Sequence, residues 1–283
     1  MGRGNETPDR YDCQRLARAA VHAGIEAGNF LRHQFRRQVD VRTKDGVGDP
    51  EAHVRDVVSE CDLRAEDMIR QRLQDVAPGS RIIGEEHGSY GDGDLCWYVD
   101  PIDGTYNFVR GLPLFCVSIG FSVAGVPRGG CVYDPSHEEL FVAVDGRLSV
   151  NGRPWRSPRP VPATSPLVLT DIPHGNRPHP ADRDLLLRLS RHAEVRRLGS
   201  SALALAWLAV GRADAAANTD IFAWDVAAGR CLVEAAGGRF VMMPDPTGTA
   251  WRGSFVAWTA AGAQVGPRLL QAVAAAGPPV PTP

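Results

Sequence analysis

The sequence predicts a mixed α/β fold, and three observations lead to this prediction. Residues 12–37 carry small and apolar side chains at helical spacing, among them Leu16, Ala23 and Leu31. The runs FCVSIGFSV, GGCVYD and ELFVAV, all between 114 and 150, are typical of antiparallel strands. After residue 166, strand-like and helix-like segments alternate, as they do in α/β proteins.

We expect residues 1–150 to form an N-terminal α+β domain built on the antiparallel sheet. Its first helix, over 12–37, leads into a charged, glycine-containing stretch at 41–56 that we predict to be an exposed loop. A second helix should occupy about 60–76, because Pro78 and Gly79 follow it. The next two strands are short and end on acids: RIIGEE reaches Glu86, and WYVD ends at Asp100.

We expect residues 151–283 to form a C-terminal α/β domain, because prolines are dense between 151 and 166 and mark a boundary. The expected elements of this domain, in order, are strand PLVLTDI, a helix near 181–192, strand EVRRLG, a helix from about 200, strand ADAAANTD, a helix opened by WDVAAG, strands RFVMM and FVAWTA, and a last helix over about 262–276.

Composition excludes several classes of protein. The 283 residues include 31 Lys and Arg against 33 Asp and Glu, and this balance argues against nucleic-acid binding through a large basic face. No apolar run approaches the length of a membrane span, and no secretory signal is visible, so we expect a cytoplasmic protein. The six cysteines form no CxxC pair and no zinc pattern, which indicates reduced thiols.

Three acidic motifs lie where predicted strands or helices meet loops. They are Gly84-Glu85-Glu86, the stretch from Asp100 to Thr105, and Trp224-Asp225. Carboxylates that gather at the ends of elements repel one another and lose solvation unless a cation lies between them. Because the acids are hard oxygen ligands and the three motifs contain no His or Cys, Mg²⁺ is the expected occupant.

The spacing within DPIDGT supports this interpretation. The proline fixes φ and supplies no N–H, so the turn can direct the carboxylates of Asp100 and Asp103 and the carbonyl of Ile102 to one point. The glycine that follows allows close approach, and the amides of Gly104 and Thr105 can then face an anion. Metal ions beside free amides predict a site for phosphoryl transfer.

At these motifs the sequence resembles the inositol monophosphatase family of Mg²⁺-dependent, typically Li⁺-inhibited phosphomonoesterases. The resemblance rests on GEE at 84–86, DPIDGTYNF at 100–108 and WDVAAG at 224–229, with weaker matches in DVVSECD at 56–62 and GSSALALAWLAVGRADA at 199–215. Together these segments span most of residues 55 to 240. The resemblance implies a layered α/β/α/β/α fold and a homodimer.

The resemblance also implies two or three Mg²⁺ ions. Glu85, Asp100 and the carbonyl of Ile102 would hold the first ion, and Asp100, Asp103 and Asp225 the second.

Further roles are implied in the same way. Asp62, with Glu85, would help to hold a third ion or its water, and Thr105, hydrogen-bonded to Asp62, would orient the attacking water. The reaction would be in-line attack by a metal-bound water, with no covalent enzyme intermediate. The expected contacts to phosphate and substrate are Asp103, Gly104, Thr105, Ser201, Asn218 and Asp225.

The chain departs from the family pattern on the substrate side. Asn218 stands where inositol-preferring animal members have a glutamate, and Ser201 stands where alanine is common. The loop that carries Lys44 is longer than usual. A small phosphorylated metabolite is the expected substrate, either a cyclitol or sugar phosphate or, alternatively, histidinol phosphate or a nucleoside or secondary-metabolite phosphate. An alternative of another class is a catalytically silent dimer that binds phosphoesters.

Two other interpretations of the central motif are weaker. Asp100 and Asp103 could form a turn only, because Asp before Gly is a common turn signal, but the matching motifs at Glu85 and Asp225 argue against this. Haloacid dehalogenase-type phosphatases carry DxDGT, whereas two residues separate the acids here. We expect Glu86 to neighbour the site without binding metal.

Overall fold

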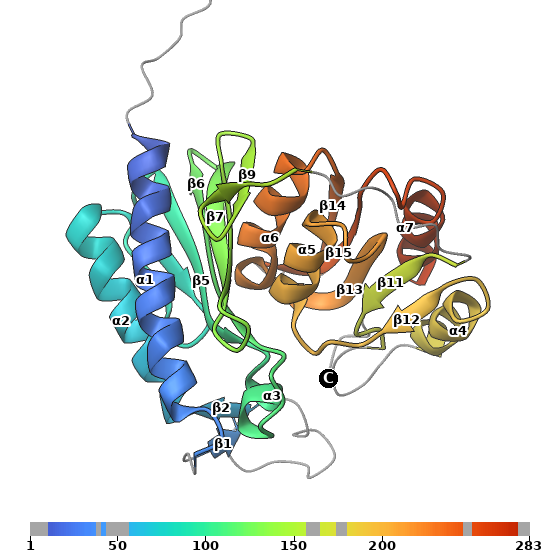
Figure 1. Ribbon diagram of the computed structural model, residues 1–283, viewed down its shortest axis with the longest axis horizontal. Coiled ribbons are helices and arrows are strands. Elements are labelled where there is room, and N and C mark those ends of the chain that lie inside the picture. Colours follow the sequence, from blue (N-terminus) through green and yellow to red (C-terminus); the bar gives the residue numbers. More distant parts are fainter. Residues whose placement is uncertain are drawn as a thin grey trace, which may run out of the picture.

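The computed structural model describes residues 11–37, 41–43, 57–156, 165–173, 180–245 and 251–276. Two mixed sheets alternate with three pairs of helices in five layers (Figure 1). One pair covers the outer face of the larger sheet, one pair lies between the sheets, and one pair covers the outer face of the smaller sheet. The mixed α/β class and the layered α/β/α/β/α arrangement are therefore confirmed.

The first layer consists of α1 (Cys13–Gln34) and α2 (Glu60–Val76). Asp12 caps α1, because its Oδ1 accepts hydrogen bonds from the amides of Gln14 at 3.0 Å and Arg15 at 3.1 Å. Both helices bury their small and apolar faces against the larger sheet. Both predicted helices are confirmed, and α1 ends three residues earlier than expected.

The larger sheet has eight strands in the order β10-β9-β8-β7-β6-β5-β3-β4. Its strands are β3 (Arg81–Gly84), β4 (Gly88–Tyr90), β5 (Leu95–Asp103), β6 (Cys116–Val123), β7 (Val126–Asp134), β8 (Glu139–Val144), β9 (Arg147–Val150) and β10 (Arg153–Pro154). The antiparallel strands predicted for 114–150 are confirmed as β6 to β9.

Two expectations about this part of the chain are corrected. Strand β5 does not stop at Asp100: it continues to Asp103, with an irregular register against β6 between these two residues. The predicted loop at 41–56 begins with a strand, because β1 (Val41–Thr43) pairs antiparallel with β2 (Val57–Ser59). The rest of that predicted loop, including Lys44, lies outside the described residues.

The middle layer contains α5 (Ser201–Ala209) and α6 (Ala223–Ala235), both of which pack between the two sheets (Figure 1). Every residue of α5 except Trp207 is buried, as is typical of a helix that has no face toward solvent. A short helix, α3 (Thr105–Val109), follows β5 directly.

The smaller sheet has the order β12-β11-β13-β15-β14. Its elements and the helices on its outer face are β11 (Leu167–Thr170), α4 (Pro180–Leu189), β12 (Glu194–Arg196), β13 (Ala215–Phe222), β14 (Arg239–Pro244), β15 (Arg252–Trp258) and α7 (Gly266–Ala276). The predicted alternation of strands and helices is confirmed. The last helix begins at Gly266, because turns occupy residues 262–265.

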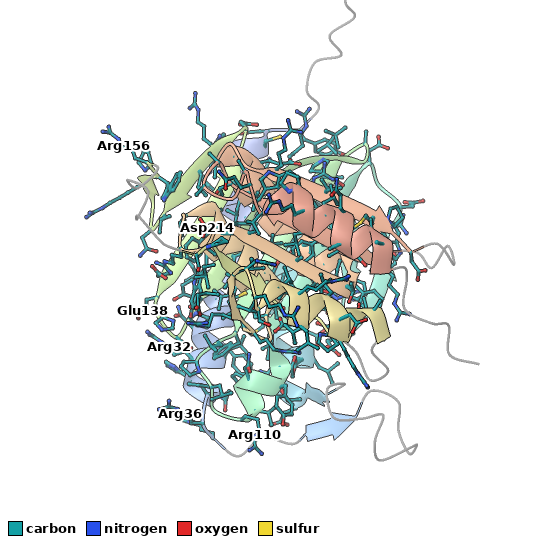
Figure 2. All side chains as sticks on the ribbon, turned by 90° about the vertical axis from the view of Figure 1, so that its right-hand side faces the viewer. Arg32, Arg36, Arg110, Glu138, Arg156 and Asp214 are labelled. Atoms are coloured by element: carbon teal, nitrogen blue, oxygen red, sulfur yellow. The ribbon has the colours of Figure 1, made fainter. Side chains whose placement is uncertain are left out.

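The cysteines are reduced, as the sequence predicts, and charged side chains lie at the surface (Figure 2). All six cysteines are buried and free. Charged side chains cover the outside, where Arg32 near the end of α1 pairs with Glu138 in the turn after β7 (Figure 2). Within the described residues, no helix has both the length and the apolar character needed to cross a membrane.

Candidate active site

The predicted acids gather where β3 and β5 end. These strands are parallel neighbours, so their carboxyl ends meet at the same edge of the sheet. Glu85 directly follows β3, and its amide donates to the carbonyl of Val99 at 3.2 Å. Asp100 and Asp103 lie on the last residues of β5.

The N-termini of helices bring the remaining acids to this place. Asp62 lies in the first turn of α2, and Asp225 lies in the first turn of α6, where its Oδ2 accepts a hydrogen bond from the amide of Phe222 at 2.7 Å. The positive end of a helix dipole favours carboxylates at such positions. Glu85, Asp103 and Asp225 all act electrostatically on Asp100.

Asp100 is the least satisfied of these acids. Its side chain is almost fully buried, and its Oδ1 has no hydrogen-bond partner. Burial and the neighbouring charges of Glu85, Asp103 and Asp225 raise its pKa well above the ordinary range. A buried oxygen of this kind needs either a proton or a cation.

Asp103 caps α5 from the adjoining strand. Its carboxylate accepts hydrogen bonds from Ser200 Oγ and the amide of Ala202, both at 2.6 Å, and from the amide of Ser201 at 3.1 Å. Burial nevertheless outweighs these bonds and raises its pKa to about 6. Its Oδ2 also lies 3.4 Å from the amide of Leu203 and 3.7 Å from Cys116 Sγ, whereas among the described residues its Oδ1 accepts from the amide of Ser201 alone. Oδ1 therefore keeps an acceptor position for a cation.

Asp62 joins α2 to the end of β5. Its Oδ2 accepts from the Ser59 amide at 2.8 Å and from Ser59 Oγ at 2.6 Å, which completes a capping box. Its Oδ1 accepts from Thr105 Oγ1 at 2.9 Å, so the expected Thr105–Asp62 hydrogen bond is present. Burial raises the pKa of Asp62 to about 6 despite these bonds.

The turn between β5 and α3 requires glycine at position 104. Gly104 has φ = 104°, and a Cβ there would lie 2.8 Å from the carbonyl oxygen of Leu114. Both the conformation and the space therefore exclude larger residues. The chain enters α3 at Thr105 immediately after this turn.

Ser201 and Asn218 form a polar group beside the acids. Asn218, on β13, is 1% exposed; its Oδ1 accepts from the amide of Asp171 at 2.5 Å, and its Nδ2 donates to Ser201 Oγ at 2.8 Å. The amide of Asn218 is therefore turned toward other protein groups on both sides. Ser201 is adjacent to the acids, because its own amide donates to Asp103.

The acids are close together but are not arranged as a finished coordination shell. Among the described residues, no three His, Cys, Asp or Glu side chains are placed to coordinate one ion. The chemistry of the site still fits a hard cation: its ligands are carboxylates, and Asp100 Oδ1 is buried without a partner.

Sequence reasoning missed one acid next to this site, Glu66. It lies on α2 four residues after Asp62, and its side chain is fully buried. Its Oε2 accepts from the amide of Glu86 at 2.8 Å. The signal was available, because residues four apart on a helix share a face, so the spacing of Asp62 and Glu66 predicts two acids on one face.

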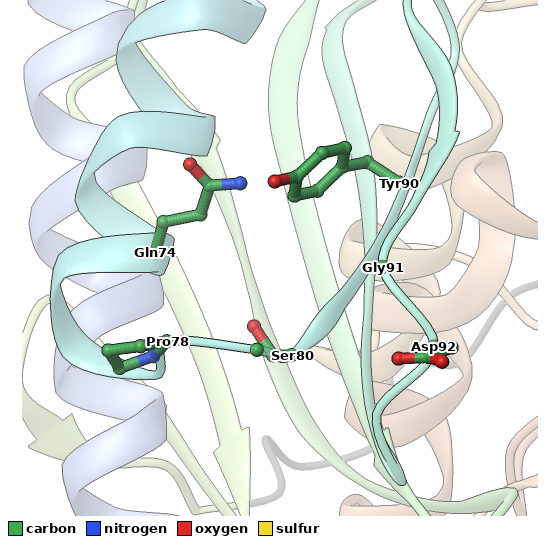
Figure 3. Close-up of a pocket in the computed structure, with 7 residues that line it drawn as sticks. Gln74, Pro78, Ser80, Tyr90, Gly91 and Asp92 are labelled. Carbon is green, nitrogen blue, oxygen red and sulfur yellow. The ribbon is translucent and has the colours of Figure 1, made fainter.

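A surface hollow lies at the opposite end of β3 (Figure 3). Residues around Ser80 and Tyr90 line it, together with Gln74, Pro78, Gly79, Gly91 and Asp92. Of these seven residues only Asp92 is a carboxylate, and none is a cation. The hollow therefore lacks both the acids for a metal and the positive charge for a phosphate.

Comparison with known proteins gives consistent matches. Residues 12–275 match the model of the inositol monophosphatase family. The chain is 35% identical to inositol-1-monophosphatase of Mesorhizobium japonicum over 229 residues, which cover 79% of this chain and 84% of that protein.

Solved structures agree. The extragenic suppressor protein suhB of Bartonella henselae superposes with a TM-score of 0.78 at 29% identity, covering 91% of this chain and 98% of that one. Inositol monophosphatase from Anabaena superposes with a TM-score of 0.72 at 29% identity, covering 94% and 97% respectively.

Proposed function

The chain belongs to the inositol monophosphatase family and is a phosphoric monoester hydrolase, and we propose that it hydrolyses a small phosphorylated metabolite with Mg²⁺ as its cofactor. The observation that carries this proposal is the buried, unpartnered Oδ1 of Asp100, surrounded by further acids. Such an arrangement is costly without a divalent cation and favourable with one.

Two metal ions would be held by acids from three places in the fold, the end of β3, β5 and the first turn of α6. Glu85, Asp100 and the carbonyl of Ile102 would form one set of ligands, and Asp103 and Asp225 would complete a second set with Asp100. When bound, Mg²⁺ supplies Lewis-acid polarisation of the phosphoryl oxygens and lowers the pKa of water. A third ion would involve Asp62 with Glu85.

We assign the handling of the attacking water to Thr105 and Asp62. Thr105 Oγ1 lies within hydrogen-bond distance of two acceptors, Asp62 Oδ1 at 2.9 Å and the Ile102 carbonyl at 3.0 Å. When its one proton is directed to Asp62, its lone pairs can accept a proton from a water molecule. The pKa of Asp62, raised by burial to about 6, leaves its carboxylate mostly ionised at neutral pH and still basic enough to accept a proton through Thr105. Asp62 therefore serves as the base of this pair.

The phosphate would be bound by backbone amides. The chain turns at Gly104 into α3, and the amides of Gly104 and Thr105 stand beside the acids at the end of β5. Backbone donors at such a turn favour an anion whose charge is balanced by metal on its other side.

The substrate class we propose is a cyclitol or sugar phosphate. Histidinol phosphate or a nucleoside or secondary-metabolite phosphate is the alternative, because Asn218 replaces the glutamate that contacts inositol hydroxyls in inositol-preferring relatives. Asn218 acts indirectly in this proposal: it orients the Ser201 hydroxyl, and Ser201 contacts the leaving alcohol.

The test is a screen of phosphorylated metabolites with released phosphate as the readout, each with Mg²⁺ and with chelator. We expect release from at least one cyclitol or sugar phosphate that requires Mg²⁺ and falls when Li⁺ is added. A protein that binds phosphoesters but releases no phosphate at any metal concentration would support the silent dimer instead. Size-exclusion chromatography of the same sample tests the expected homodimer.

A further inference from the structure

We propose that Glu66 is a positioning residue for the metal site: it holds the segment Glu85–His87 so that the Glu85 carboxylate faces Asp100. The inference rests on the proposed function, because it concerns Glu85 as a ligand. Glu66 itself acts through the backbone and is not assigned to the metal.

The carboxylate of Glu66 binds the segment immediately after Glu85. Oε2 accepts from the amide of Glu86 at 2.8 Å, and Oε1 accepts from the amide of His87 at 3.1 Å. The ring Nδ1 of His87 also lies 3.1 Å from Oε1 and, as the N–H donor, supplies a third bond. Three donors on two consecutive residues therefore converge on one buried acid.

The same carboxylate lies against the backbone immediately before Glu85. A Cβ on Gly84 would lie 2.3 Å from Glu66 Oε1, so the absence of a side chain at position 84 makes room for the acid. The Glu66 carboxylate therefore lies against Gly84 on one side of Glu85 and accepts hydrogen bonds from Glu86 and His87 on the other. The hydrogen bonds fix the backbone that follows Glu85, and this restricts the directions in which the Glu85 side chain can point.

The charge of Glu66 is balanced by groups of its own. Arg70 lies one turn further along α2, and its Nη1 is 3.6 Å from Glu66 Oε1. The other ring nitrogen of His87, Nε2, lies 3.4 Å from the neighbouring acid Asp67. Glu66 is fully buried, whereas Asp67 is largely exposed. A buried carboxylate satisfied in this way has no need of a metal ion, which separates its role from that of Asp100.

If Glu66 positions Glu85, loss of its hydrogen bonds should weaken the binding of Mg²⁺. In metalloproteins, substitution of a residue that holds a metal ligand in place typically lowers the affinity for the metal by roughly 10- to 100-fold. Glu66→Gln keeps the size of the side chain but presents an NH₂ group to the donors of Glu86 and His87, so part of the anchor is lost.

The experiment measures Mg²⁺ binding to the metal-free protein by titration calorimetry. We expect Glu66→Gln to raise the Kd by about 10-fold or more. The Mg²⁺ concentration for half-maximal phosphate release should rise by the same factor, while kcat at saturating Mg²⁺ stays close to that of the wild type. In the metal-free variant, the amides of Glu86 and His87 should exchange hydrogen faster.

Ile69→Val is the matched control. Ile69 is fully buried on the same helix, so its truncation should lower stability. Its side chain is apolar and makes no hydrogen bond to the Glu85–His87 segment, so the Kd of Ile69→Val for Mg²⁺ should equal that of the wild type. Gly84→Ala is a second route to the same effect, because its Cβ displaces the carboxylate of Glu66 without removing a charge. It should also raise the Kd.

The outcomes separate the two proposals. A wild-type Kd in Glu66→Gln, or an equal rise in Ile69→Val, overturns the positioning role, as does unchanged hydrogen exchange at Glu86 and His87. A wild-type protein that binds no Mg²⁺ overturns the proposed function, while the exchange data still decide whether Glu66 anchors the segment.

Discussion

At the scale of single residues, the acids of the site differ in how well the protein satisfies them. Asp103 and Asp62 accept several hydrogen bonds, and their pKa values rise only to about 6. Asp100 has an oxygen with no partner, and burial and its neighbouring acids raise its pKa well above the ordinary range. Substitutions at Asp100 and Asp103 should therefore have opposite effects on the stability of the metal-free protein.

Asp100→Asn should stabilise the metal-free protein at neutral pH, because folding forces the buried carboxyl either to take up a proton or to stay charged beside three other acids, and a neutral amide avoids this cost. A gain of about 1 kcal/mol corresponds to roughly 2–4 °C in Tm for a chain of this size. Thermal denaturation in chelator measures this gain, and Mg²⁺ should no longer raise the Tm of the variant.

Asp103→Asn should lower the Tm in chelator, because the variant weakens the cap of α5, at a cost of about 1 kcal/mol. Phosphate release should also fall by about two orders of magnitude or more. A stabilised Asp103→Asn, or near-normal turnover, would contradict the assignment of this residue.

Asn218→Asp tests the substrate side of the site. The variant still accepts from the amide of Asp171 but no longer donates to Ser201, so the Ser201 hydroxyl turns its proton toward the new carboxylate. If one hydrogen bond to the leaving alcohol is lost, about 1 kcal/mol, KM should rise roughly fivefold with little change in kcat. Steady-state kinetics on the substrate found by screening measure this, and an unchanged KM would exclude Ser201 from substrate binding.

At the scale of elements, the turn between β5 and α3 combines two demands on one glycine. Gly104→Ala forces an L-residue to a positive φ and also places a Cβ 2.8 Å from the Leu114 carbonyl. We expect a loss of more than 2 kcal/mol in the unfolding free energy and a loss of phosphate release.

Gly146→Ala is the control for this prediction. Gly146 has a similar positive φ of 69°, and no atom lies within 4 Å of the position its Cβ would take. Gly146→Ala should lower the unfolding free energy, measured with denaturant, only by the conformational cost of about 1–2 kcal/mol. The variant should keep its phosphatase activity. Equal losses in the two variants would show that the contact with Leu114 is unimportant.

The sequence predicts individual elements well where local signals define their ends. Helix α2 runs over 60–76 as expected, because Ser59 and Asp62 cap its start and Pro78 follows its end. The sequence predicts the end of β5 too early, at Asp100, because an acid followed by a proline suggests a break, whereas pairing with β6 continues the strand to Asp103.

The parts of the site that the sequence could not supply depend on contacts between distant segments. The orientation of Asn218 is set by Asp171 and Ser201, which no local pattern connects. Asp103 was predicted as a metal ligand, but its bonds to the start of α5 require knowledge of how the strand and helix pack. The division into domains at 151–166 stays a prediction.

At the scale of the whole molecule, the group of buried acids should make stability depend on pH and on metal. Asp62 and Asp103 have pKa values of about 6 in the folded protein against an ordinary 3.8, so the folded state holds more protons between these values. The unfolding free energy of the metal-free protein should therefore fall as the pH rises from about 4 to about 6.

Saturating Mg²⁺ should reverse this trend, because the metal replaces protons on the same oxygens and binds more tightly as they leave. Denaturant unfolding at several pH values, with chelator and with Mg²⁺, compares the two slopes. Metal-free protein whose stability increases over this interval would contradict the pKa shifts.

The placement of α5 and α6 has a consequence for synthesis on the ribosome. The inner face of the larger sheet is covered by these two helices, which are encoded after all eight of its strands. A nascent chain that has emerged only as far as β10 therefore has one apolar sheet face bare, and α5, apolar on all sides, cannot form a stable helix before the second sheet arrives. Products of premature termination before Ala223 should aggregate or be degraded, and co-translational chaperones should engage this chain late in its synthesis.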